Sequence, residues 1–223
     1  MNKELVQYLS TFITPGRLEV FDRILKQRTR YLTVVLEDIY QPQNASAVIR
    51  TADCFGIQDL YVIENNNLFT IDKEVALGAS KWVDIRKFNT KGNSTGRAVV
   101  YLRKKGYRIV ATSPHEGDVN LEDYDLAKGK TALFFGTELS GVSDLVRSEA
   151  DEFLKIPMYG FTESLNISVS AGIILQELTH RMRLHPEVDW LLTPAEQEEV
   201  KLSWLRRSIK MASLIEGRFL KSK

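Results

Sequence analysis

The middle of this 223-residue chain alternates between short apolar segments and segments of helical periodicity. The apolar segments are rich in Val, Ile, Leu and Phe and are too short for helices, which favours buried β-strands. We predict strands over 31–36, 60–63, 107–111, 131–135 and 153–156. We predict helices over 44–55, 96–105 and 164–183. Strands that alternate with helices form a parallel sheet covered by helices, so the predicted fold class is α/β.

Both ends of the chain lie outside this alternation and are rich in cations. Thr14 followed by Pro15 begins a helix near the N-terminus, and a last helix is expected over about 194–215. We therefore expect a basic helical extension at the N-terminus, a central α/β domain and a second basic helical extension at the C-terminus. Their bounds are 1–30, 31–185 and 186–223.

The composition excludes several classes of protein. The chain is 43% hydrophobic and 26% charged, which is ordinary for a globular protein with a sizeable core. No apolar run approaches the length of a membrane span, and the first ten residues have no apolar block of the kind found in secretory signals. The single cysteine, Cys54, excludes an intramolecular disulfide and a cysteine-rich zinc site, and the histidines lack metal-ligand spacing. We expect a cytoplasmic protein without a metal or a membrane partner.

The formal net charge is only +1, but the cations are clustered. Residues 16–30 contain five cations and two anions, residues 84–108 contain eight and one, and residues 201–223 contain seven and one. Solvated helix faces would account for such runs. A nearly neutral protein can also carry basic faces of this kind, which bind RNA through its phosphates.

In a parallel sheet, ligands bind beyond the carboxyl ends of the strands, so the segments after the strands are the place to look for a site. The first of these segments is 41–52 and contains Asn44 and Arg50. Asn44 could be a simple helix N-cap, and Arg50 could be a surface cation. However, Arg50 has small or apolar neighbours, and a cation that emerges from a packed helix needs an anionic partner such as a phosphate.

The second segment, 134–143, joins a strand to a helix through a glycine-containing loop. The spacing of Gly136 and Gly141 fits a phosphate-binding P-loop, but Val142 occupies the position of the essential lysine. A nucleoside triphosphate is therefore a poor candidate ligand. We predict instead a tight turn that approaches a ligand closely and carries Glu138, which could also simply favour the start of a helix.

The third segment, 156–170, places polar residues at the start of an apolar helix. Ser164 could be a helix N-cap. It is not surrounded by the Gly-x-Ser-x-Gly pattern of a hydrolase nucleophile, so the sequence argues against that activity.

These three segments, in this order, resemble the motifs of SPOUT-class RNA 2′-O-ribose methyltransferases. Within that class the chain is most similar to the tRNA (guanosine(18)-2′-O) methyltransferase family. The resemblance implies a SPOUT fold with a C-terminal trefoil knot, S-adenosylmethionine as the methyl donor, and a homodimer with its active site across the interface. The matching residues are Asn44, Arg50, Thr51, Ala52, Gly136, Glu138, Gly141, Ile156, Pro157, Met158, Gly160, Ser164, Leu165, Asn166, Ile167, Ser168 and Val169.

The resemblance also assigns roles to individual residues. Arg50 would activate the ribose hydroxyl; because a guanidinium is essentially never deprotonated, it would stabilise alkoxide character rather than remove the proton itself. The other catalytic positions would be Asn44, Glu138, Ser164 and Asn166. The donor would be bound by Thr112, Gly136, Ile156, Met158, Ser164 and Leu165. No metal is needed, since the donor sulfonium is already an activated leaving group.

The expected substrate is tRNA, methylated at the 2′-hydroxyl of guanosine 18 in the D-loop. A ribosomal RNA methyltransferase of the same class would share all three motifs, and a non-catalytic RNA-binding module is a further alternative. The expected RNA contacts are Arg17, Arg23, Arg28, Lys81, Lys87, Arg206 and Arg207.

Overall fold

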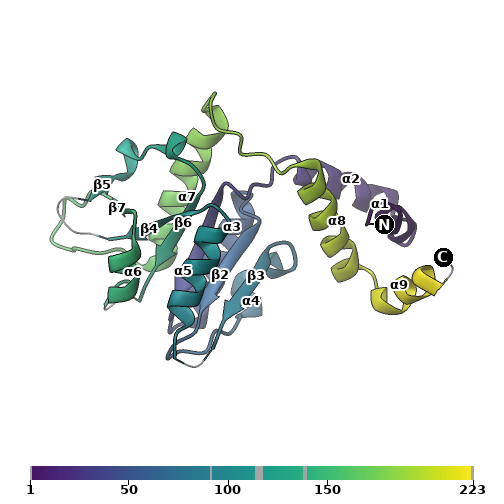
Figure 1. Ribbon diagram of the computed structural model, residues 1–223, viewed down its shortest axis with the longest axis horizontal. Coiled ribbons are helices and arrows are strands. Elements are labelled where there is room, and N and C mark those ends of the chain that lie inside the picture. Colours follow the sequence, from purple (N-terminus) through teal and green to yellow (C-terminus); the bar gives the residue numbers. More distant parts are fainter. Residues whose placement is uncertain (1, 91, 114–117, 138–139, 222–223) are drawn as a thin grey trace. The chain divides into compact units, whose positions relative to one another are not determined.

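A computed structural model describes residues 2–90, 92–113, 118–137 and 140–221 of the chain (Figure 1). These residues form two compact units. One unit combines the two ends of the chain, Met1–Thr29 and Leu191–Lys223, and the other is the continuous segment Arg30–Trp190.

The terminal unit consists of helices α1 (Asn2–Ser10), α2 (Pro15–Leu25), α8 (Pro194–Ser208) and α9 (Ala212–Lys221). Helix α8 packs against the other three helices, and its buried Trp204 lies edge-on against Phe21 of α2, with 5.3 Å between ring centroids. The two ends of the chain, which the sequence treats as separate extensions, thus share one small core. Thr14 caps α2 as predicted and accepts a hydrogen bond from the Arg17 amide at 3.4 Å.

The prediction of one final helix over 194–215 is wrong, because the chain breaks between α8 and α9. Ile209 has extended backbone angles, and Met211 has a φ of 63°, a left-handed conformation that a helix cannot contain. Each of the two shorter helices can therefore take its own direction within the terminal unit.

The central unit is built on a seven-stranded sheet in the order β3-β2-β1-β6-β4-β7-β5, in which every neighbouring pair is parallel. This confirms the predicted fold class. The strands are β1 (Leu32–Glu37), β2 (Asp59–Ile63), β3 (Asp84–Phe88), β4 (Arg108–Thr112), β5 (Val119–Asn120), β6 (Thr131–Phe135) and β7 (Glu152–Lys155). β6 lies between β1 and β4, so the second candidate segment leaves the centre of the sheet.

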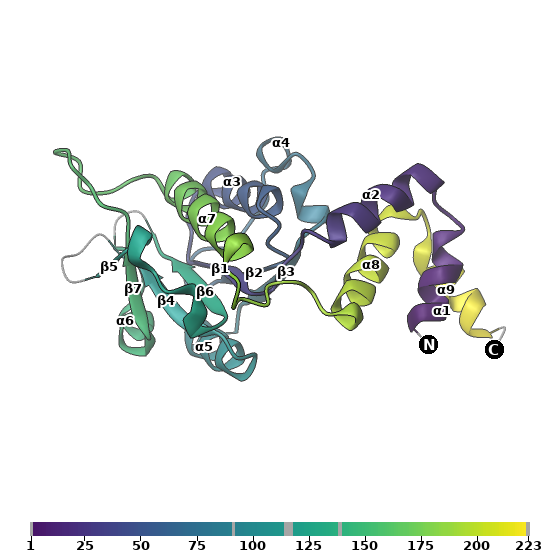
Figure 2. The ribbon, with the colours of Figure 1, turned by 90° about the horizontal axis from the view of Figure 1, so that it is seen from above.

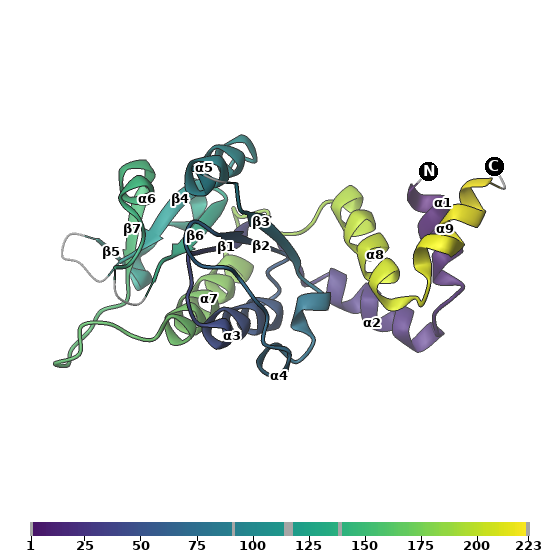
Figure 3. The same ribbon diagram turned by 90° about the horizontal axis from the view of Figure 1, so that it is seen from below.

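Helices cover both faces of this sheet (Figures 2 and 3). Successive strand residues point to opposite faces. In β1, Val34 packs in a core with α3 (Pro42–Cys54) and α7 (Ile167–Leu184), whereas Val35 packs with α5 (Ser94–Lys104) and α6 (Asp144–Glu149). The remaining helical elements are α4 (Lys73–Ala76) and the short 3₁₀ turns Ala79–Lys81, Leu121–Asp123 and Leu126–Lys128.

The predicted segments agree with the observed elements to within three residues at most ends, and the bounds of β6 agree at both ends. Strands β3 and β5 and helices α1, α4 and α6 were not predicted. The helix expected from Ser164 begins at Ile167, so Ser164 lies in the preceding loop. None of the helices in the described part of the chain is both long and apolar enough to cross a membrane.

Candidate active site

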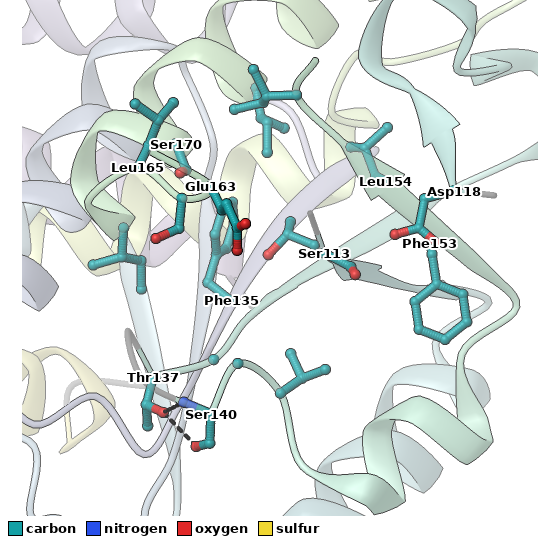
Figure 4. Close-up of a pocket in the computed structure, with 18 of the residues that line it drawn as sticks. Ser113, Asp118, Phe135, Thr137, Ser140, Phe153, Leu154, Glu163, Leu165 and Ser170 are labelled. Atoms are coloured by element: carbon teal, nitrogen blue, oxygen red, sulfur yellow. Dashed lines mark hydrogen bonds between the residues drawn. The ribbon is translucent and has the colours of Figure 1, made fainter. Parts of the chain in front are cut away.

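A hollow of about 640 Å³ opens beyond the carboxyl ends of β4, β6 and β7 (Figure 4). This volume lies within the range of small-molecule sites, and the position is the one expected for ligands of parallel sheets. Figure 4 shows Thr137 and Ser140 on one side of the hollow, Glu163 and Leu165 on a second side, and Asp118 on a third. Residues from the second and third candidate segments therefore face one another across one pocket, which we call the edge pocket.

The turn that begins at Gly136 is closed on itself. The amide of Thr137 donates to the carbonyl of Gly141 at 3.0 Å, and the amide of Gly141 donates to the carbonyl of Thr137 at the same distance. A Cβ atom on Gly136 would lie 2.0 Å from the Gly141 carbonyl oxygen, and Gly141 itself has a φ of 66°. Both positions therefore require glycine, as the close-approach turn predicted from the sequence demands. Glu138 lies outside the described residues.

The third segment joins the first through a pair of amides. Asn166 caps α7 by accepting hydrogen bonds from the amide of Ser168 at 2.9 Å and from its hydroxyl at 2.6 Å. Its Nδ2 donates to Oδ1 of Asn44 at 3.1 Å. Asn44 is buried inside α3, which begins at Pro42, so the alternative role of Asn44 as a helix N-cap is wrong. Ser164 is not the cap of α7 either, because Asn166 is.

All the positions to which the resemblance assigned donor binding line the edge pocket. They are Thr112, Gly136, Ile156, Met158, Ser164 and Leu165. The pocket also contains two carboxylates that the sequence analysis missed, Asp118 and Glu163, together with the guanidinium of Arg147. The two anionic groups suit a donor that carries a sulfonium and an ammonium charge. Glu163 directly precedes the motif residue Ser164, so the sequence offered a signal for it. Nothing in the sequence around Asp118 indicates a role in a binding site.

Arg50 does not line the edge pocket. It is exposed on α3 and borders a separate hollow of about 700 Å³ between α3 and α7, together with Cys54 and Ile173. The neighbouring Val48 and Ala52 are buried, so Arg50 emerges from a packed helix as expected, on a face of α3 that is open in the single chain. Among the described residues, no group of three or more His, Cys, Asp or Glu side chains is placed to hold a metal ion.

The predicted RNA contacts differ in their exposure. Arg28 is only 2% exposed, and its guanidinium lies 5.4 Å from the ring centroid of Trp204, so direct contact with RNA is excluded in this conformation. The ammonium of Lys87 lies 3.0 Å from the buried carboxylate of Glu64 and also donates to a backbone carbonyl. Its charge is already neutralised within the fold. Arg17, Arg23, Lys81 and Arg207 are exposed to solvent.

Arg206 is half-exposed but is held by Glu216 of α9, with 3.0 Å between Nε and Oε2. This hydrogen bond lowers the pKa of the Glu216 carboxyl and raises the pKa of Arg206. The pair therefore ties α8 to α9 and leaves Arg206 with little unpaired charge for RNA.

The sequence analysis named few of the residues of a further basic surface. A hollow of about 640 Å³ beside β3 and α5 is lined by Arg86, Arg97 and Lys104, and we call it the β3–α5 groove. The guanidinium of Arg86 stacks over the ring of Tyr101, 4.1 Å from its centroid. Exposed cations beside an aromatic ring are typical of surfaces that bind nucleic-acid strands. The strong positive charge of residues 84–108 was the available signal for this groove.

Comparisons with known proteins identify the family of this chain. The sequence profile of the SpoU rRNA Methylase family matches residues 31–176. The chain is 43% identical to the tRNA (guanosine(18)-2′-O)-methyltransferase of Borreliella burgdorferi, over 94% of this chain and 93% of that protein. Its fold resembles the crystal structure of the A. aeolicus TrmH/SpoU tRNA modifying enzyme, with a TM-score of 0.76, 30% identity and coverage of 87% and 98% of the two chains.

A further similar structure contains the methyl donor. The SpoU methyltransferase AviRb from Streptomyces viridochromogenes, in complex with the cofactor AdoMet, has a TM-score of 0.61 and 26% identity, over 74% of this chain and 65% of that one. Given the parallel sheet, the edge pocket and a family profile that matches well over half of its residues, this chain belongs to the SpoU rRNA methylase family of RNA methyltransferases.

Proposed function

We propose that this protein transfers a methyl group from S-adenosylmethionine to the ribose 2′-hydroxyl of guanosine 18 in tRNA. The observation that carries the proposal is the edge pocket, where the second and third motif segments meet. The hydrogen bond between Asn44 and Asn166 joins the first motif segment to the third. The family profile is named for ribosomal RNA, but the relative that matches 94% of this chain acts on tRNA.

Residues of the edge pocket divide the work of binding. The closed turn at Gly136 presents backbone groups at close range, and Ile156, Met158 and Leu165 supply apolar contact for an adenine ring. Asp118 and Glu163 place negative charge beside the positively charged donor. When bound, the donor would supply a methyl group on a sulfonium sulfur, which leaves as the neutral thioether of S-adenosylhomocysteine when the S–CH3 bond breaks. The protein then has to hold a ribose hydroxyl in line with that methyl group.

We infer that the active unit is a homodimer, since one chain does not bring Arg50 to its own edge pocket. The α7 face beside Arg50 is apolar and exposed: Val169 is 47% exposed and Ile173 is 39% exposed, four residues apart on one side of the helix. Tyr159 and Phe161, in the loop before α7, are also almost wholly exposed. We propose that a second copy covers these side chains and that Arg50 of each copy completes its partner's pocket.

In that position Arg50 has a defined chemical role. Its guanidinium cannot act as a base at neutral pH, but it can bind a phosphate and stabilise the oxygen as negative charge develops on it. Asn44 and Asn166 fix the relative position of α3, which carries Arg50, and α7, which leads from the pocket wall.

RNA binding would use the exposed cations of both units. In the central unit these are Arg86, Arg97 and Lys104 of the β3–α5 groove, and in the terminal unit Arg17, Arg23 and Arg207. Such contacts hold the RNA by its backbone, so they favour binding without selecting the nucleotide. A tRNA substrate supports a location in the cytoplasm. The trefoil knot stays a prediction from the resemblance.

Methyl transfer from labelled S-adenosylmethionine tests the activity directly. An unmodified tRNA transcript should accept label, and the same transcript with adenosine at position 18 should accept none. If only a ribosomal RNA fragment is labelled, the ribosomal alternative replaces the proposal. If no RNA is labelled although the donor binds, the protein is an RNA-binding module rather than an enzyme.

A mixing experiment tests the shared active site. Arg50→Ala removes the guanidinium, and Leu165→Asp damages the pocket wall, so each variant alone should be inactive. If equal amounts are co-refolded at random, half of the dimers contain one copy of each variant. In each of these dimers one of the two sites is intact, because it combines the undamaged pocket of one copy with Arg50 of the other. About a quarter of wild-type activity should return. Recovery of no activity would show that Arg50 and the pocket of the same chain act together.

A further inference from the structure

Glu37, the last residue of β1, is a buried carboxylate that the mechanism above does not use. It is 3% exposed. Its Oε1 accepts hydrogen bonds from the hydroxyls of Thr95 at 2.7 Å and Ser143 at 2.8 Å, and its Oε2 accepts one from the amide of Ser143 at 2.8 Å. In the described part of the chain, no Lys or Arg forms an ion pair with it. Three neutral donors therefore solvate this charge inside the protein.

Two of the three donors belong to the far end of the turn that lines the edge pocket. The turn begins at Gly136, where it continues β6, and ends at Ser143, the N-cap of α6. Gly141 and Val142, directly before Ser143, line the pocket. The near end of the turn is thus fixed by the sheet, and its far end is held by the Glu37 carboxylate.

The choice of a carboxylate at this position requires an explanation. A buried charge loses its hydration, and an apolar residue would fill the same space without that cost. A carboxylate is useful where several donors must be held at once, since it accepts hydrogen bonds on both oxygens. Here it gathers the N-terminal turn of α5, through Thr95, and the pocket turn, through Ser143, around the end of β1.

We propose that Glu37 is a positioning residue that holds Gly141 and Val142, directly before Ser143, in the arrangement that binds the methyl donor. It does not touch the donor itself and acts through Ser143. The inference rests on the assignment of the edge pocket to the donor under the proposed function.

The chain offers a matched control in the next residue. Asp38 is also buried, at 9% exposed, and its Oδ1 accepts backbone hydrogen bonds from Asn65, Asn66 and Asn67 at 2.7, 2.9 and 3.2 Å. The loop that it holds, 65–67, does not line the edge pocket. Loss of either carboxylate should destabilise the fold, but only loss of Glu37 should loosen the pocket turn.

The test compares Glu37→Gln and Ser143→Ala with Asp38→Asn. S-adenosylhomocysteine affinity is measured by calorimetry, the KM for S-adenosylmethionine and for tRNA by methyl transfer, and folding by thermal denaturation. Glu37→Gln should weaken S-adenosylhomocysteine binding about tenfold and raise the KM for the donor similarly, because its amide cannot accept all three hydrogen bonds. The KM for tRNA should change less than about twofold. Ser143→Ala should shift donor affinity in the same direction, and the double variant should be no worse than Glu37→Gln alone.

Asp38→Asn should lower the melting temperature while its donor affinity stays within about twofold of wild type. The proposal is overturned if Glu37→Gln keeps wild-type donor affinity, or if Asp38→Asn weakens donor binding equally. Should Glu37→Gln fail to fold, Ser143→Ala decides the question, since it removes one of the three hydrogen bonds and leaves the carboxylate in place. Leu165→Asp, in the pocket wall, separates this proposal from the proposed function. If Leu165→Asp retains donor affinity, the assignment of the edge pocket to the donor fails. If Leu165→Asp loses donor affinity while Glu37→Gln and Ser143→Ala keep it, only the role of Glu37 fails.

Discussion

The hydrogen bond between Asn44 and Asn166 yields a quantitative prediction, because Asn166 carries two separable functions. Its Oδ1 caps α7 and its Nδ2 donates to Asn44 on α3. Loss of a helix cap costs about 1 kcal/mol of stability. Loss of the partly buried hydrogen bond between the two amides also costs about 1 kcal/mol. Asn166→Ala should therefore lower the free energy of unfolding by about 2 kcal/mol, the sum of these two estimates.

Two further variants separate these contributions. Asn166→Ser keeps a good capping residue but cannot reach Asn44, so it should lose only about 1 kcal/mol. Asn44→Ala removes the same bond from the other side and should lose a similar amount. The Asn44→Ala/Asn166→Ala double variant should be about 1 kcal/mol more stable than additivity predicts, because the shared bond can be lost only once.

Urea denaturation followed by circular dichroism measures all four variants against wild type. Equal slopes with denaturant are required for the comparison, since a change in slope indicates loss of two-state behaviour. Additive losses in the double variant would refute the cross-helix hydrogen bond as an energetic link, and equal losses for the serine and alanine variants at position 166 would refute the capping role.

Three other predictions follow from the described contacts. Burial favours the neutral form of Asp38, but the surrounding backbone amides hold the pKa of this carboxyl below its ordinary value. Its contribution to stability is therefore present above the unfolded pKa and is lost as the pH falls through the folded pKa. In urea titrations, the free energy of unfolding should fall less between pH 7 and pH 3 in Asp38→Asn than in wild type. Gly136→Ala should abolish measurable S-adenosylhomocysteine binding in calorimetry, since its Cβ would lie 2.0 Å from the Gly141 carbonyl oxygen, and unchanged affinity would show that the turn does not hold the donor. Arg86→Glu combined with Arg97→Glu should weaken tRNA binding at least about tenfold and flatten its salt dependence in filter binding, with donor affinity unchanged.

The sequence predicts the central strands well because their residues are apolar on both faces. β6, buried throughout between β1 and β4, has the clearest pattern. β3 was missed for the opposite reason: it is an edge strand, and its Arg86 and Lys87 are exposed. Charged residues on an edge strand prevent pairing with other sheets but remove the apolar pattern on which sequence prediction depends.

The candidate site could be predicted where its residues cluster in short segments and not where it depends on distant contacts. The turn at Gly136 and the loop before α7 carry recognisable patterns. Glu37 has none, because a carboxylate at a strand end is ordinarily a surface residue; its burial depends on Thr95 and Ser143, which lie 58 and 106 positions away. The placement of Arg50 outside the pocket was also unpredictable, since it follows from which face of α3 remains open in the folded chain.

The end of β1 and the start of α3 contact residues that adjoin the lining of the edge pocket. Glu37, at the end of β1, binds the second motif segment through Ser143, and Asn44, in the first turn of α3, binds the third through Asn166. Substitutions at these two positions should therefore change donor affinity, because the pocket walls move when their supports are lost. Arg50, on the open face of the same helix, supports neither wall, so its loss should abolish transfer while the donor still binds. Under the proposed function, the first motif segment combines support for the donor pocket with a group for the ribose, and donor affinity measured without RNA separates the two roles.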